Sequence, residues 1–179
     1  GHFGLNKQEF PNGIQGLKNC VDKAELQGVK LGTHCLSNFI TTNDPYVTPI
    51  PDQRLAKAGS TVITEAIDSK AIEIPIAAPD FFNAIENNNL KTVMIGDELI
   101  RYSRVSDKAP WRLLDCQRGA FNTTPSSHNK EQEISKLLDH SYKVFLTNAE
   151  LTIEMSERLA ELYNQTGMRQ ISFDGLEGN

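Results

Sequence analysis

The chain has 179 residues, a formal net charge of −5, 39% hydrophobic and 23% charged residues. An acidic chain of this kind does not fit a nucleic-acid binder, which carries a basic face or stripe. No apolar run approaches the roughly 18 residues of a membrane-spanning helix, so we expect no membrane partner. The three cysteines show no metal-type spacing, and no metal or cofactor site is predicted.

Residues 1–42 have an α/β pattern. Phe10-Pro11-Asn12-Gly13 is a turn that opens a helix, and apolar residues recur at helical spacing from Ile14 to Ala24. Gly28 stands where a left-handed residue commonly ends a helix. The short apolar run 29–36 predicts a strand, so this part forms one step of a parallel sheet.

Residues 43–137 differ from what precedes them. A proline-rich passage, 44–51, disfavours helix and predicts an extended linker or loop. Short β-like runs separated by turn residues follow it, at 60–67, 71–76, 92–95, 98–105 and 111–116. This spacing predicts a small antiparallel β domain, because the insertion far exceeds the 2–6 residues of an ordinary βα loop.

Residues 138–179 return to the α/β pattern. Thr147 and Glu150 have the spacing of a capping box, an amphipathic helix follows, and Gly167 is placed to end it. The apolar run 169–173 then predicts a strand that delivers Asp174. A carboxylate at the carboxyl end of a strand is typical of catalytic sites in parallel α/β folds, although Asp-Gly is also a common turn.

The two α/β steps match each other. If their strands are parallel neighbours, the polar strand ends share one mouth, and His34 and Asn38 lie beside Asp174. A structural role for His34 explains the sequence equally well. Strand edges left open in this part favour self-association of the chain.

Two passages resemble a known family. Phe10-Pro11-Asn12-Gly13-Ile14 with 28–34, and 167–174, resemble stretches of α-galactosidase-type retaining glycosidases. The resemblance implies an α/β fold class: partial (β/α)8 TIM-barrel-type units at 1–42 and 138–179, interrupted by an inserted small antiparallel β domain at 43–137. It implies that Asp174 is the nucleophile and that the general acid/base lies beyond residue 179. Ser172 stands where the family has Lys.

The β-rich part has a resemblance of its own. Ile95 to His128 is similar to a small β unit of phage tail and fibre-like proteins, on the residues Glu98, Arg118 and Thr123-Thr124. We interpret these residues structurally, with Glu98 paired to Arg118 across strands and the threonines satisfying loop backbone. A ligand site is the alternative. His128 and His140 stand in polar loops and are predicted to be solvated.

These observations predict a carbohydrate-active protein, a fragment of a retaining glycoside hydrolase that degrades oligosaccharides or polysaccharides in the extracellular space or the periplasm. Asp174 is the catalytic candidate, and Glu177, His34 and Asn38 are substrate-binding candidates. Asp174 and Glu177 could also form the carboxyl pair of a retaining enzyme. The alternatives are a non-catalytic glycan-binding or structural module and an inert fragment. Trp111 is either a sugar-stacking platform or a core residue.

Overall fold

A computed structural model describes residues 2–174 of the chain. The described residues divide into two compact units, the first made of 2–39 and 149–174 and the second of 40–148. The domain boundaries proposed from composition, at residues 42 and 137, stay a prediction. Within the described range, neither α-helix combines the length and the hydropathy that a membrane crossing requires.

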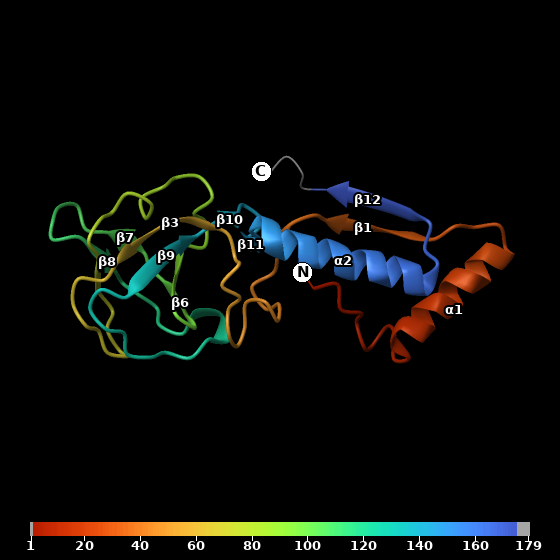
Figure 1. The fold of residues 1–179 in the computed structure, drawn as a ribbon, viewed down its shortest axis with the longest axis horizontal. Coiled ribbons are helices and arrows are strands. Elements are labelled where there is room, and N and C mark those ends of the chain that lie inside the picture. The colour runs from red at the N-terminus through yellow and green to blue at the C-terminus, as the bar shows by residue number, and fades with distance from the viewer. Residues whose placement is uncertain (1, 175–179) are drawn as a thin grey trace. The chain divides into compact units, whose positions relative to one another are not determined.

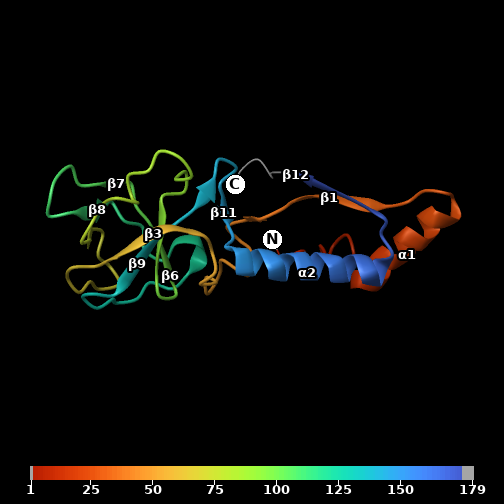
Figure 2. The same ribbon diagram turned by 45° about the horizontal axis from the view of Figure 1, so that its top comes forward.

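The first unit contains α1 (Gly13–Leu26), β1 (Gly32–Leu36), α2 (Ala149–Thr166) and β12 (Gln170–Asp174). The strands β1 and β12 pair in parallel, with Gly32 opposite Gln170 and Leu36 opposite Asp174. Both views show α2 running along one side of this strand pair (Figures 1 and 2). The two strands are therefore parallel neighbours, which is the condition for their polar ends to share one mouth.

Both helices of the first unit end as the sequence predicts. Gly28 and Gly167 follow α1 and α2 with φ of 74° and 78°, in the left-handed region that glycine adopts without a steric penalty. The apolar stripe of α2 is buried at Leu151, Met155 and Leu159. This burial holds α2 in place, because most helix stability in proteins comes from the packing of an amphipathic face.

One tyrosine of α2 fixes the two strands. The Tyr163 hydroxyl donates to the Gln170 carbonyl at 2.6 Å and accepts from the Thr33 amide at 3.0 Å. One side chain thereby reaches the backbone of both β1 and β12.

The second unit is built from short strands. They are β2 (Phe39–Ile40), β3 (Lys57–Val62), β4 (Ile74–Pro75), β5 (Thr92–Ile95), β6 (Glu98–Arg101), β7 (Arg104–Val105), β8 (Arg112–Leu114), β9 (Glu133–Leu137), β10 (Asp139–His140) and β11 (Val144–Leu146), with the 3-10 helix η1 (Ala120–Asn122). The first residue of β2, Phe39, is the last residue of the first unit's N-terminal part. The sheet orders are β3-β9-β5-β6, β4-β8-β7 and β10-β11-β2. The first two sheets are antiparallel throughout.

An apolar core fills the second unit. Its buried side chains include Ile63, Ile74, Ile95, Ile100, Leu113 and Ile134. Trp111 is half-buried and packs against this cluster, as the core interpretation of that residue predicts. The proline-rich passage 44–51 is a loop, one of the two predicted possibilities, and not an extended linker. The amides of Val47 and Thr48 donate to the Asp44 carbonyl within it, and Val47 is fully buried.

The fold class predicted from the sequence is wrong. The described residues contain two α-helices, one parallel strand pair and mainly small antiparallel sheets, with no closed barrel. A (β/α)8 barrel requires eight parallel strands hydrogen-bonded in a ring. The matching steps at the two ends of the sequence instead pair with each other and form a sheet of two strands.

Candidate functional site

The side of the β1–β12 pair that faces away from α2 carries the polar residues singled out in the sequence. Side chains alternate between the two faces of a strand, and residues opposite each other in a parallel pair share a face. His34 pairs with Ser172, and Leu36 pairs with Asp174, so these four residues lie on one face, here called the open face. Phe173 lies on the other face, where it lines a recess together with Leu159 of α2.

Three polar side chains converge on the open face. His34 Nδ1 lies 3.2 Å from Ser172 Oγ, and His34 Nε2 lies 3.7 Å from Asp174 Oδ2. The His34 and Asp174 side chains are 66% and 50% exposed. The second distance is too long for a hydrogen bond, so water or a ligand hydroxyl can reach both groups.

The other two substrate-binding candidates, Asn38 and Glu177, are not seen on the open face. Asn38 is buried, at 8% exposure, and its Oδ1 accepts a hydrogen bond from Ser37 Oγ at 3.3 Å. Burial removes most of the surface with which Asn38 could contact a substrate. Glu177 lies outside the described residues, as does any group beyond it. A retaining hydrolase holds a second carboxyl group about 5–5.5 Å from its nucleophile. The sequence places that group either at Glu177 or beyond residue 179, and both lie outside the described residues.

Ser172 is a site residue that the sequence argument missed. In the family resemblance, Ser172 stands out only because it occupies the position of a lysine. It also lies two residues before Asp174 on the same strand. In a strand this spacing places both side chains on one face. That periodicity was the available signal.

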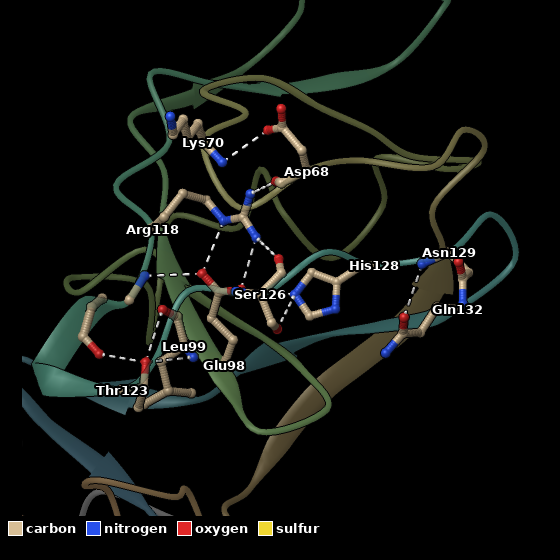
Figure 3. A network of polar contacts seen from close by, with 12 residues as sticks. Asp68, Lys70, Glu98, Leu99, Arg118, Thr123, Ser126, His128, Asn129 and Gln132 are labelled. Atoms are coloured by element: carbon tan, nitrogen blue, oxygen red, sulfur yellow. Dashed lines mark hydrogen bonds and ion pairs between the residues drawn. The ribbon is translucent and has the colours of Figure 1, made fainter.

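A second polar cluster lies in the second unit (Figure 3), and its members Glu98 and His128 are buried. Glu98 is fully buried, and its carboxylate accepts five hydrogen bonds. Arg118 donates to it through Nε at 2.9 Å and Nη2 at 2.8 Å, and His128 donates through Nε2 at 2.7 Å. The backbone amides of Gly119 and Ser126 donate the other two, at 2.9 and 3.1 Å.

The surroundings of Glu98 favour its ionised carboxylate form. Burial is the largest influence and by itself would raise the pKa of the carboxyl group. The bonds from His128, Arg118 and the two amides outweigh it and lower the pKa of Glu98 to about 2. Because the carboxylate can only accept, the Nε2 of His128 must carry a proton.

The same cluster ties several loops together. Arg118 also donates to the carbonyls of Asp68 and Ser126. Thr123 Oγ1 accepts from the Leu99 amide at 3.0 Å. The predicted pairing of Glu98 with Arg118 is thus confirmed, although Arg118 lies in a turn and not in a strand. Thr123 bonds to backbone groups as predicted, and the role of Thr124 stays a prediction. The prediction that His128 is solvated is wrong, because its ring is buried against Glu98.

We found no side-chain group suited to a metal ion among residues 2–174, where three or more His, Cys, Asp or Glu would have to converge. Burial raises the pKa of the Cys35 thiol, which lowers its tendency to act as a thiolate ligand or nucleophile.

Comparison with known proteins gives no match: no family model, no curated protein and no solved structure is significantly similar to this chain. The family resemblance drawn from the sequence is therefore wrong as an assignment. No barrel pattern is present in the described residues, and no family match supports a glycoside hydrolase. The resemblance of the β-rich part to phage tail units receives no support from these comparisons either.

Proposed function

We propose that this chain is a non-catalytic carbohydrate-binding module and that the open face of β1 and β12 contacts the sugar. One observation carries the proposal: His34, Ser172 and Asp174 present an imidazole, a hydroxyl and a carboxylate side by side on an exposed surface. These groups donate and accept hydrogen bonds in the combinations that neighbouring sugar hydroxyls require. Leu36, half-buried on the same face, offers an apolar surface to the C–H side of a sugar ring.

The exposure of the open face favours binding over catalysis. General acid–base and nucleophilic groups gain most of their effect where water is excluded and the surrounding dipoles are fixed. Half of the Asp174 side chain is exposed to solvent. Three hydrogen bonds of about 1–1.5 kcal/mol each correspond to a dissociation constant on the order of 1 mM, the range of a weak sugar contact.

The test is a glycan array on the full chain, followed by isothermal titration calorimetry with the best ligand. Asp174→Asn and His34→Ala should each weaken binding by roughly five- to tenfold, the equivalent of one lost polar contact. Asp22→Asn is the matched control. Its carboxylate is also 50% exposed and belongs to the same unit, on α1. That variant should bind within twofold of the unmodified chain.

Two results would contradict the proposal. Binding that is unaffected by both open-face substitutions would remove the site, as would an array without any bound glycan. Release of new reducing ends from the bound oligosaccharide would refute the non-catalytic assignment.

A further inference from the structure

Within residues 2–174, β12 lies at the edge of a sheet that has only two strands. β1 pairs with it on one side, and no described strand pairs with the other side (Figures 1 and 2). Such an edge presents backbone amides and carbonyls to which a further strand can bind.

The backbone groups of Ile171 and Phe173 face this open edge. The Ser37 amide of the β1 side donates to the Asp174 carbonyl at 3.3 Å, so Asp174 directs its backbone groups towards β1. These directions alternate along a strand. Ser172 therefore also faces β1, and the amides and carbonyls of Ile171 and Phe173 point the opposite way.

The side chains of the same two residues are apolar and exposed. Ile171 is 38% exposed and Phe173 is 49% exposed. Both line a recess of about 330 Å³ beside α2, together with Leu159, Ala160 and Tyr163 of that helix. A strand that binds to β12 removes this surface from water when it carries apolar side chains at alternate positions.

A second copy of β12 meets these requirements when it runs antiparallel, with Ser172 at the twofold axis. Ile171 then lies opposite the partner's Phe173, and Phe173 lies opposite the partner's Ile171. Each of these pairs exchanges its amide and carbonyl hydrogen bonds, and the two Ser172 residues form the non-hydrogen-bonded pair between them. A surface that complements itself in this way is what a twofold dimer requires.

Charge complementarity favours the same arrangement. A cation, Arg169, stands just before β12, and a carboxylate, Asp174, ends it, with side chains 61% and 50% exposed. Antiparallel pairing brings each Arg169 near the partner's Asp174, whereas parallel pairing would place like charges side by side. The arrangement depends on the sign of each strand end and leaves the contacts of Arg169 with Glu25 and of Asp174 with His34 in place.

We propose that this chain forms a twofold dimer through the edge of β12, which joins the two strand pairs into one sheet in the order β1-β12-β12-β1. The partner's Phe173 covers Ile171 at the recess beside α2. The dimer does not depend on sugar recognition, because the side chains of Ile171 and Phe173 lie on the face opposite the open face.

Sedimentation velocity of the full chain at several concentrations measures the association, and we expect a reversible equilibrium of monomer and dimer. Phe173→Lys should raise the dimer dissociation constant at least about tenfold, because it removes the aromatic side chain from the centre of the interface. Ile171→Pro should do the same and keep the pairing with β1, because its lost N–H faces the open edge. Ile153→Lys is the matched control. This residue of α2 is 60% exposed and stands outside the recess, so the constant should change by less than about twofold.

Cysteine cross-linking tests the register, in a Cys20→Ser background that removes the exposed native thiol. Ser172→Cys should give a disulfide-linked dimer on mild oxidation, because Cα atoms of a non-hydrogen-bonded pair lie about 4.5 Å apart, within the range of a disulfide. Gln170→Cys is the control on the same face of the same strand. Its Cα is displaced by about four residues, roughly 13 Å, from that of the partner's Gln170, so it should cross-link at least about ten times more slowly.

The proposal is overturned if the chain stays monomeric up to about 1 mM. It is equally overturned if the dimer persists unchanged in Phe173→Lys, or if Gln170→Cys cross-links as fast as Ser172→Cys. Circular dichroism establishes that each variant is folded; should Ile171→Pro fail to fold, Phe173→Lys and the cross-linking pair still decide.

Discussion

Replacement of Glu98 by alanine removes the acceptor at the centre of the second unit. Its carboxylate accepts five hydrogen bonds from Arg118, His128 and the amides of Gly119 and Ser126. Without it, the guanidinium of Arg118, whose side chain is 6% exposed, stays buried with no counter-charge. Breaking a buried ion pair by removing one partner costs about 3–5 kcal/mol of unfolding free energy.

Glu98→Gln should be nearly as damaging although it preserves the shape of the side chain. One carboxylate oxygen becomes an amide NH₂ group, which faces donors on Arg118, His128 or a backbone amide. Donor against donor leaves buried groups unsatisfied, at about 1–3 kcal/mol each. We therefore expect a loss of about 3 kcal/mol or more from this substitution as well.

Urea denaturation followed by tryptophan fluorescence measures this effect in the full chain. Trp111 is the only tryptophan of the sequence and packs against the core of the second unit, so its emission reports that unit. Glu65→Gln is the control, since this exposed glutamate of the same unit has only a long contact of 3.5 Å to Arg112. It should change stability by less than about 1 kcal/mol. A Glu98→Ala loss no larger than the control would refute the reasoning.

The pH dependence follows from the same carboxylate. The pKa of Glu98 is about 2 in the folded chain, below its ordinary value of 4.5. Its contribution is therefore complete above pH 4.5 and is lost as the pH falls from there towards 2, by about 3 kcal/mol in all. The stability difference between the unmodified chain and Glu98→Gln should shrink from pH 6 to pH 3. A difference that stays constant over this range would contradict the assignment.

Substitutions at four further positions test other contacts. Burial lowers the pKa of Lys136 to about 8, although Asp139, 4.0 Å away, opposes this shift. The urea midpoint of the unmodified chain should therefore rise as the pH rises from 8 towards 10, where the buried ammonium loses its charge, and Lys136→Met should abolish this rise. Gly119→Ala should lower the unfolding free energy by more than about 2 kcal/mol in the same assay, because a Cβ at this φ of +59° would meet Pro125 and the Thr123 carbonyl within 2.8 Å. Gly96→Ala is the control. This residue also has a positive φ, but the nearest atom to its Cβ would be the end of the Gln132 side chain at 3.5 Å, so the loss should stay near about 1 kcal/mol. Tyr163→Phe should lower the thermal midpoint of the first unit, seen in helical circular dichroism, because it removes the donor to Gln170 and costs about 1 kcal/mol; an unchanged midpoint would contradict that role.

Local patterns predicted much of the first unit. Helical spacing with a terminal glycine anticipated α1 and α2, and the two strand predictions correspond to β1 and β12. The match between the two steps raised their parallel pairing as a condition and did not establish it. What failed was the barrel that the family resemblance implied, because short motifs fix local structure and leave the number of strands in a sheet undetermined.

In the second unit the strand β9 was missed for a different reason. Its residues Ser135 and Lys136 are polar and would ordinarily indicate a surface segment. Both are buried here, where Ser135 bonds to Ser60 at 2.9 Å and the Lys136 ammonium donates to the Leu137 carbonyl. The burial of His128 was missed in the same way. Partners distant in sequence decide such positions, and a single sequence does not show them.

The most direct test of sugar recognition at the open face is a ¹H–¹³C NMR titration of the histidine rings in the full chain. On addition of the glycan selected by the array, the His34 ring signals should shift saturably, and Asp174→Asn should reduce the affinity read from that shift. The buried His128 ring serves as the internal control and should not move. Saturable glycan binding that leaves the His34 signals unchanged would contradict the proposed site.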